Sequence, residues 1–190
     1  MISNSAFFFG YGSLVNRMTH GFTPAHTARA RGWRRAWRFT ADRKVAYLTA
    51  VPDPACEIEG LIAQVPPDGW AALDLREQAY ERRDAAGCVQ HAADGVDQLA
   101  IYAIAPQNHF PPDDAHPVLL SYLDVVIQGY LSEFGEAGAE RFFDTTTGWE
   151  APILDDRADP QYPRAQQLDD AERAFVDRRL DGLRCRRVAA

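Results

Sequence analysis

The amino-acid sequence predicts an α+β fold, with a strand-rich first half and a helical second half. The strand signal is clearest in ARGWRRAWRFT, residues 30–40, where aromatic residues alternate with arginines at period two. The helix signal is clearest in residues 116–135, where leucine, valine, isoleucine and tyrosine recur along one helical face. We therefore expect a single domain spanning residues 1–190, with a β-rich core in residues 1–110 and a helical extension in residues 111–190.

Five or six strands are expected in the core, separated by turn residues. Pro52, Asp53 and Pro54 mark a turn between two of these strands, because proline and aspartate are typical turn residues. On the strand that contains Trp33 and Trp37, the two tryptophans share one face. The expected strands are residues 7–9, 30–40, 44–51, 57–65, 81–90 and 98–105.

Two helices follow from changes in the apolar spacing. The first covers residues 66–80, after the fourth strand, and Asp68 is its expected N-cap. The second covers residues 116–135. Proline favours the start of a helix and glycine its end, so we expect this helix to start at Pro117 and end at Gly135.

The C-terminal part of the chain combines a polar stretch with a closing helix. Residues 168–180 are amphipathic and predict a helix. The preceding residues 145–168 are polar and contain several prolines, and they are long for a structureless connection. We expect this segment to form a lid or a packed arm. If it covers a site, its candidates for setting substrate size are Asp155, Asp156, Arg157 and Arg164.

Composition excludes several classes of protein. The net charge of -7 argues against nucleic acid or an anionic membrane as the main partner. Cys56, Cys88 and Cys185 are odd in number and lack paired spacing, so neither a disulfide framework nor a zinc site is expected. Free thiols are typical of a reducing cytoplasm. The chain shows no signal-peptide pattern and no stretch of roughly 18 to 20 apolar residues that would span a membrane.

The stretch FFFGYGSLVN, residues 7–16, predicts a buried strand followed by a sharp glycine-containing loop. Backbone N–H groups in such a loop can point the same way and hold a carboxylate or a developing oxyanion. An ordinary tight turn is the alternative. A nucleophilic role for Ser13 would need a base and an orienting acid, and none of the five histidines lies in a context that indicates one. We expect Ser13 to contact a ligand or cap the loop.

Glu77 is the candidate acid–base residue. It lies near the C-terminal end of the helix over residues 66–80, where the negative end of the helix dipole raises the pKa of a carboxyl group. Partial burial among the aromatic and leucine side chains would raise that pKa further. A carboxylate with a raised pKa suits a general base near neutral pH. The alternative is a solvated glutamate on the helix surface.

Two other chemistries have weaker signals. Basic and aromatic residues interleave in residues 29–44, as in some binders of single-stranded nucleic acid, but a half-buried strand with a solvated arginine face explains the same pattern. A metal site is not expected, because its candidate ligands lie in a proline-rich loop without a further ligand cluster. Those candidates are His109, Asp113, Asp114 and His116.

Three segments together resemble the gamma-glutamylcyclotransferase superfamily. They are FGYGSL at residues 9–14, RGWRRAWRF at residues 31–39 and LDLREQAY at residues 73–80. That superfamily pairs an N-terminal Y-G-S loop with a later glutamate at the end of a helix. The resemblance covers roughly residues 7–135, and residues 145–190 lie outside it. The matching positions are Tyr11, Gly12, Ser13 and Leu14 for substrate binding and Glu77 for catalysis.

The resemblance implies a small mixed β-barrel of five to six strands with flanking helices and a cavity at one end. It also implies that the α-amino group of a γ-glutamyl compound attacks its own γ-carbonyl, releasing 5-oxoproline and an amine or amino acid. Neither a cofactor nor a metal is implied, and the partner is a small γ-glutamyl molecule. The alternative is a non-catalytic relative that binds a γ-glutamyl compound or an amino acid in the same cavity.

Overall fold

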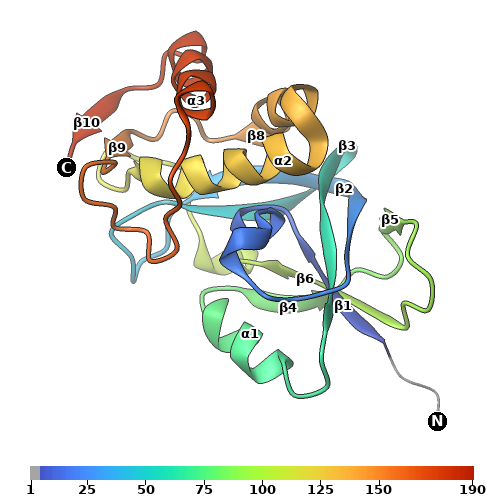
Figure 1. Ribbon diagram of the computed structural model, residues 1–190. Helices are drawn as coiled ribbons and strands as arrows, with labels where there is room; N and C mark the ends of the chain where they lie inside the picture. The colour runs from blue at the N-terminus through green and yellow to red at the C-terminus, as the bar shows by residue number, and fades with distance from the viewer. Residues whose placement is uncertain (1–4) are drawn as a thin grey trace.

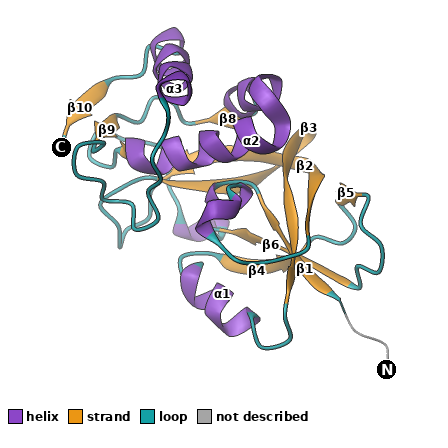
Figure 2. Cartoon of the chain, in the orientation of Figure 1, coloured by secondary structure: helices purple, strands orange, loops and turns teal. Residues whose placement is uncertain are grey.

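The computed structural model describes residues 5–190, which contain a mixed seven-stranded sheet (Figures 1 and 2). Its strands are β1 (Ala6–Gly10), β2 (Ala25–Arg38), β3 (Tyr47–Val65), β4 (Glu81–Asp84), β5 (Val89–His91), β6 (Gln98–Ala103) and β8 (Thr146–Thr147). The order across the sheet is β4-β6-β1-β3-β2-β5, and β8 pairs with the other end of β2. The β1–β6 and β2–β8 pairs are parallel, and the remaining pairs are antiparallel.

The expected α+β class is confirmed, but a closed barrel is not. Six of the seven strands lie within the first 110 residues, as the sequence predicts. Within residues 5–190, the sheet runs from β4 at one edge to β5 and β8 at the other, and no pairing joins the two edges. β4 has only four residues and is largely exposed, so it offers little ladder for closure.

The turn expected at Pro52–Pro54 lies instead inside the long strand β3. Residues 57–63 of β3 pair with residues 25–31 of β2, and residues 47–52 pair with residues 33–38. Between the two paired segments, β3 has four residues without a partner on β2, while β2 has only Gly32. Proline cannot donate to a ladder and is tolerated at such a bulge. The prolines therefore mark an irregularity within one strand rather than a connection between two.

Residues 5–190 contain three α-helices, whose ends differ from the expected ones: α1 (Trp70–Arg76), α2 (Leu120–Asp144) and α3 (Asp170–Gly182). The predicted N-cap at Asp68 is wrong. Gly69 occupies the cap position, and its N–H donates to the Pro66 carbonyl, so a backbone turn starts α1 without a side-chain cap. α2 starts at Leu120 rather than at Pro117. The chain does turn at Gly135, which has φ of 66°, but a second helical segment continues to Asp144.

The aromatic strand β1 is buried on both faces because it lies in the middle of the sheet. Phe7 and Phe9 belong to the larger apolar cluster, which also contains Val126 and Ile127 of α2. Phe8 points the other way, into a smaller cluster that contains Leu73 of α1. α2 and α1 thus cover opposite faces of the sheet (Figure 1). The loop that follows β1 emerges between these two helices.

The C-terminal residues add a second, three-stranded parallel sheet that the sequence did not predict. Its strands are β7 (Val118–Leu119), β9 (Ile153–Asp155) and β10 (Arg187–Ala189), in the order β10-β9-β7. Each has only two or three residues, too few for a period to be visible in the sequence. The expected closing helix, α3, is confirmed and packs on the second half of α2 through Phe175 and Phe143.

Replacing the N-cap of α3, Asp169, with alanine is expected to lower the free energy of unfolding by about 1 kcal/mol. The Asp169 carboxylate accepts from the Glu172 N–H at 2.8 Å, and the Glu172 carboxylate accepts from the Asp169 N–H at 2.9 Å. Alanine would leave the Glu172 N–H without its acceptor, while the Glu172 carboxylate could still accept from the N–H of residue 169. Urea unfolding of the variant measures the loss. Asp170→Ala, one residue further on, is the control and should cost less, and equal losses would contradict the cap.

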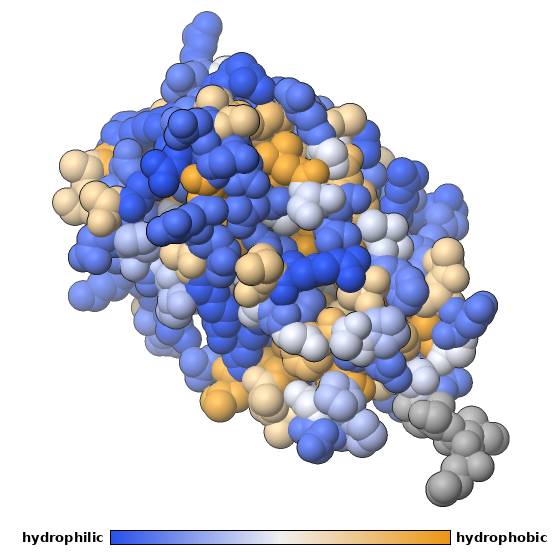
Figure 3. Space-filling view, in the orientation of Figure 1, coloured by the Kyte–Doolittle hydropathy of each residue, from blue (hydrophilic) through white to orange (hydrophobic). Residues whose placement is uncertain are grey.

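The face drawn in Figure 3 is mostly hydrophilic, with small hydrophobic areas, one of which lies over α1. In the described part of the chain, no helix combines the length and apolar character needed to cross a membrane.

Candidate active site

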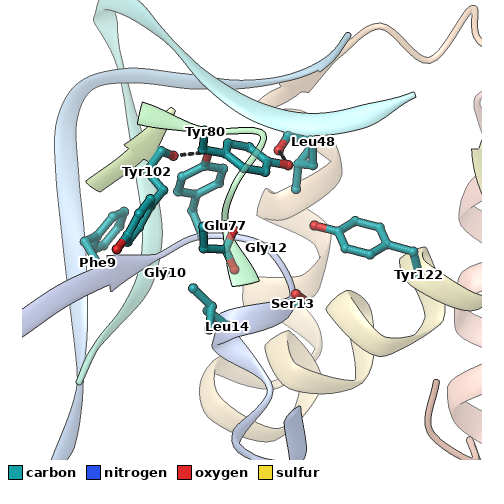
Figure 4. A pocket seen from close by; sticks show the side chains of 11 residues that line it. Phe9, Gly10, Gly12, Ser13, Leu14, Leu48, Glu77, Tyr80, Tyr102 and Tyr122 are labelled. Carbon is teal, nitrogen blue, oxygen red and sulfur yellow. Dashed lines mark hydrogen bonds between the residues drawn. The ribbon is translucent and has the colours of Figure 1, made fainter. Parts of the chain in front are cut away.

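The loop after β1 and the end of α1 meet at a small cavity between the sheet and α2. The loop continues from Gly10 into two short 3₁₀ turns, Ser13–Val15 and Arg17–Thr19. Glu77 is the C-cap residue of α1. Figure 4 shows the Glu77 carboxylate pointing toward the loop at Gly12, with Tyr122 of α2 entering from the opposite side. All five residues that the sequence singled out line this cavity: Tyr11, Gly12, Ser13, Leu14 and Glu77.

The cavity has a narrow inner part and a wider outer groove. The inner part has about 30 Å³ of space, more than the roughly 10–15 Å³ that a cavity needs to hold one water molecule. The outer groove holds about 380 Å³. Ser13, Glu77, Tyr80 and Tyr122 line both parts, so they mark the boundary between them. A small polar group fits the inner part, and the rest of a ligand would have to occupy the groove.

Glu77 has the environment expected of a proton acceptor near neutral pH. Its side chain is only 15% exposed. Burial raises the pKa of the Glu77 carboxyl above its ordinary value, while the positive charges of Arg76 and Arg164 and a hydrogen bond from Arg76 oppose that rise. Arg76 Nε lies 3.1 Å from Glu77 Oε1. The carboxylate is therefore desolvated but still has a cationic neighbour.

Arg76 also ties Glu77 to the loop. Its guanidinium donates to the Thr19 carbonyl at 2.9 Å and to Thr19 Oγ1 at 3.2 Å, and it lies 3.4 Å from Ser13 Oγ. The nearest bonded partner of the Ser13 hydroxyl is thus a cation rather than a base. His20, the histidine nearest in sequence, bonds the Leu14 carbonyl instead. This arrangement does not fit a nucleophilic Ser13.

The loop residues contribute mainly through their backbone. The Tyr11 hydroxyl is buried and already bonded, because it donates to the Tyr102 carbonyl and accepts from the Ala50 N–H at 3.0 Å. Gly12 lies against Tyr122, and a Cβ atom on Gly12 would be 2.6 Å from the Tyr122 hydroxyl. Within residues 5–190, the N–H groups of Gly12 and Leu14 have no hydrogen-bond acceptor. Those two donors are available to a ligand.

Gly12→Ala is expected to displace the Tyr122 hydroxyl and to cost about 1–3 kcal/mol in the free energy of unfolding, as overpacking does. In the double variant Gly12→Ala/Tyr122→Phe, the hydroxyl is gone, and the ring carbon that carried it is 3.9 Å from the new Cβ. The double variant should recover most of the loss. Thermal unfolding of both variants and of Tyr122→Phe alone measures the coupling, and additive losses would refute the contact.

Sequence reasoning expected Tyr80 to help bury the Glu77 carboxylate but missed Tyr122, which lines the same cavity. Tyr80 donates to the Leu48 carbonyl at 2.9 Å, and Tyr122 stands across the loop from Glu77 (Figure 4). Burial raises the pKa of both phenols well above the ordinary value, so both stay neutral. The spacing of Tyr122 predicts only a place on the apolar face of its helix, and nothing in the local pattern indicates that its hydroxyl reaches the loop.

Residues 145–168 reach the groove at one end only. Gln161, Tyr162 and Arg164 line it. Asp156 is buried and accepts from the Ser121 N–H, the Ser121 hydroxyl and the Gln161 N–H. These bonds tie the segment to the start of α2, as in a packed arm.

Neither Asp156 nor its neighbours Asp155 and Arg157 line the groove. Arg157 makes two bonds to the Asp124 carboxylate and one to Asp177. Asp155 lies at the end of β9 and accepts from the Arg157 N–H. Of the four residues named as candidates for setting substrate size, only Arg164 lines the groove.

Three of the four residues considered for a metal have other partners, whereas the buried Nδ1 of the fourth, His109, has no hydrogen-bond partner within the described residues. His116 stacks on Phe39 and bonds Asp113, and Asp114 pairs with Arg186. The described residues contain no group of three or more potential ligand side chains that could hold a metal ion.

The arginines of β2 are only partly a solvated face. Arg31 and Arg34 pair with carboxylates of β3, namely those of Glu57 and Asp53. Arg35, in contrast, is 1% exposed. It shares strand parity with Trp33 and Trp37, which is the signal that could have placed it on the buried face.

No protein-family model and no curated protein sequence matches the chain. Solved structures do match. A gamma-glutamyl cyclotransferase is 14% identical with a TM-score of 0.55, and the match covers 92% of this chain and 99% of that one. An uncharacterised protein from Homo sapiens is 14% identical with a TM-score of 0.58 and the same coverage. YkqA from Bacillus subtilis is 18% identical with a TM-score of 0.52, and the match covers 77% of this chain and 57% of that one.

These matches extend into the C-terminal residues, which the sequence resemblance did not reach, because a coverage of 92% must include part of residues 145–190. At such low identity they establish the architecture and not the activity. The matched structures include a member of the family that the three sequence segments resemble, and the chain has the gamma-glutamylcyclotransferase-like fold, although its sheet is not a closed barrel within residues 5–190.

Proposed function

We propose that the protein is a γ-glutamyl cyclotransferase. The α-amino nitrogen of a γ-glutamyl compound attacks the γ-carbonyl carbon of the same molecule and closes a five-membered ring. The bond between that carbon and the leaving nitrogen breaks. The α-ammonium nitrogen gives up two protons as it becomes the N–H of the ring, and the leaving nitrogen gains two, so the products are 5-oxoproline and the amine or amino acid in its ammonium form.

The observation that carries the proposal is the buried Glu77 carboxylate facing the Gly12 backbone across the cavity (Figure 4). An α-ammonium is mostly protonated at neutral pH and must lose a proton before it can attack. A carboxylate whose pKa is raised by burial can take that proton and then pass it to the leaving nitrogen. The attack is intramolecular, so holding the substrate in a bent conformation supplies much of the acceleration.

In this proposal, the γ-carbonyl group of the substrate lies in the inner part of the cavity and the leaving group lies in the outer groove. The N–H groups of Gly12 and Leu14 are donors for the γ-carbonyl oxygen as it gains negative charge. The leaving group would extend into the outer groove, which Arg43 and Arg164 line. The groove is large enough for a single amino acid, for Cys-Gly or for a larger amine. The free thiols of the three cysteines are consistent with the cytoplasmic location that the sequence predicts.

Incubation with a panel of γ-glutamyl compounds tests the proposal. The panel should contain γ-glutamyl amino acids, glutathione and γ-glutamyl amines, with 5-oxoproline followed by mass spectrometry. At least one member should be converted by the protein, and none by heat-inactivated protein. If no member is converted but some raise the melting temperature, the proposal fails in favour of the non-catalytic binding module.

A further inference from the structure

Arg35 is a buried cation that the proposed chemistry has not used. It comes from β2, points into the core beside Trp37, and is 1% exposed. Among the described residues, no carboxylate lies within ion-pair distance of its guanidinium, although 18 other ion pairs are present. Burying a charge without a counter-ion is costly unless hydrogen bonds compensate. The partners of Arg35 therefore indicate what the charge is for.

The hydrogen-bond partners of Arg35 are all neutral groups, and one of them, the Tyr11 carbonyl, belongs to the loop that follows β1. Arg35 Nε donates to the Tyr11 carbonyl at 3.1 Å. Its Nη1 donates to Thr145 Oγ1 at 2.6 Å, and its Nη2 donates to the Glu59 carbonyl and to the Tyr130 hydroxyl, each at 2.5 Å. The guanidinium carbon also lies 4.9 Å from the ring centre of Tyr130. Every end of the guanidinium is thus fixed.

Tyr130 of α2 holds the same loop carbonyl. Its hydroxyl lies 3.0 Å from the Tyr11 carbonyl oxygen and 2.6 Å from the Glu59 carbonyl oxygen, either of which can accept its single proton. Burial raises the pKa of Tyr130 to about 12, although Arg35 opposes the rise. The phenol therefore keeps its proton at neutral pH. The charged Arg35 guanidinium therefore donates to the carbonyl of the first loop residue, and the neutral Tyr130 hydroxyl lies within hydrogen-bond distance of the same carbonyl.

Fixing the Tyr11 carbonyl also fixes the direction of the Gly12 N–H, because the two belong to the same peptide group. A trans peptide is planar, with its C=O and N–H pointing in opposite directions. If the Tyr11 carbonyl points to Arg35 in the core, the Gly12 N–H points away from the core. Gly12 lines the inner cavity together with Tyr122, and its N–H has no acceptor within residues 5–190. A charged donor on the carbonyl also polarises the peptide and strengthens its N–H as a donor.

We propose that Arg35, assisted by Tyr130, is a positioning residue that aims and polarises the Gly12 N–H for the substrate oxygen that becomes negative. Arg35 does not touch the substrate. The inference rests on the proposed cyclotransferase function, because the substrate oxygen belongs to that reaction. A donor that acts on developing charge lowers the barrier without tightening ground-state binding, so its loss appears in kcat and not in KM.

Four variants separate positioning from stability. Arg35→Met removes the charge and keeps an apolar side chain, and Arg35→Lys restores a charge. Tyr130→Phe removes only the second donor and leaves Arg35 in place, so the proposal can be tested even if Arg35→Met does not fold. Arg141→Met is the matched control, because Arg141 bonds the Glu59 carboxylate in the same region but does not contact the Tyr11 carbonyl.

We expect Arg35→Met to lower kcat by about tenfold to a hundredfold with KM nearly unchanged, less than the full loss of an oxyanion donor. Tyr130→Phe should lower kcat by a smaller factor, Arg35→Lys should recover part of the loss, and Arg141→Met should keep wild-type kcat. Melting temperatures should not rank the variants in the same order as kcat. Unchanged kcat in the soluble Arg35 variants and in Tyr130→Phe, or losses that follow stability alone across all four, would overturn the proposal.

A second readout does not need turnover. The amide proton of Gly12 should move upfield in the nitrogen–proton correlation spectrum of Tyr130→Phe and of Arg35→Met, because its peptide is less polarised, while Arg141→Met should leave it in place. If the wild type makes no 5-oxoproline but the Gly12 signal moves in Tyr130→Phe and Arg35→Met, the cyclotransferase proposal has failed, while the positioning of the Gly12 N–H by Arg35 and Tyr130 stands. If the wild type makes 5-oxoproline and the Gly12 signal stays in place in these variants, only the positioning role of Arg35 and Tyr130 has failed.

Discussion

Glu77→Gln is expected to lower kcat for 5-oxoproline formation by about 10²–10⁴-fold, the range that a positioned general base contributes. Glutamine has the same size and can keep a contact with Arg76, but it cannot accept the proton of the α-ammonium group. KM should change much less, because the substrate contacts assigned to the loop are untouched. Steady-state kinetics with the best member of the substrate panel measures both constants.

Glu81→Gln is the matched control for this variant. Glu81 lies four residues further on, its side chain is 52% exposed, and it pairs with Arg83. The control should keep wild-type kcat. Turnover that survives Glu77→Gln unchanged would remove Glu77 from the mechanism, and an equal loss in both variants would trace the effect to the segment rather than to the carboxylate.

The second large effect is the pH dependence of turnover. Only ionised Glu77 can accept a proton, so kcat/KM for the wild type should fall about tenfold per pH unit below the pKa of Glu77 in the free enzyme. Because burial raises that pKa, the acid limb should lie above the ordinary range of a glutamate. The charge of Arg164 opposes the rise, so Arg164→Met should move the limb to higher pH. Arg82→Met is the control, since Arg82 pairs with Asp74 and is not among the groups that shift Glu77.

The same pKa makes a prediction for stability that needs no substrate. The folded state of the wild type binds the Glu77 proton more tightly than the unfolded state does. The resulting stabilisation is complete below the unfolded pKa and is lost as the pH rises through the folded pKa. Glu77→Gln lacks this loss, so its free energy of unfolding relative to the wild type should rise from about pH 4 to neutral pH, by about 1.4 kcal/mol for each unit of raised pKa. A difference that does not vary with pH would contradict the raised pKa.

The candidate site was predictable from the sequence to the extent that it depends on short segments. A buried aromatic strand, glycines at its end and a glutamate at the end of a helix are local patterns, and the resemblance linked them. The structure brings Tyr11–Leu14 and Glu77 to one cavity. The assignment of roles to them stays a proposal.

The remaining features depend on contacts between distant segments. The Tyr122 hydroxyl reaches Gly12 only because α2 packs across the sheet. Arg35 is held in the core by Glu59 of β3 and by Tyr130 and the C-cap residue Thr145 of α2, which converge on it from distant parts of the sequence. No local pattern reports such convergence, although the shared parity of Arg35 with Trp37 was visible.

Some features of the fold could likewise be predicted from local sequence patterns, and others could not. The class and the long helices follow from periodicity, which needs only neighbouring residues. The bulge that carries Pro52 and Pro54 through β3, and the failure of the sheet to close, depend on pairing between strands. The short strands β7, β9 and β10 exist only because residues more than 30 positions apart come together.

The most direct test of the central claim is to run the reaction in water enriched in oxygen-18. Ring closure by the substrate's own amino group takes no oxygen from water, so the expected product is unlabelled 5-oxoproline, with no labelled glutamate. A substrate whose α-amino group is acetylated should give no product, because the nucleophile is blocked. Glutamate carrying oxygen-18 would mean that water is the nucleophile, and it would contradict the cyclotransferase account of this site.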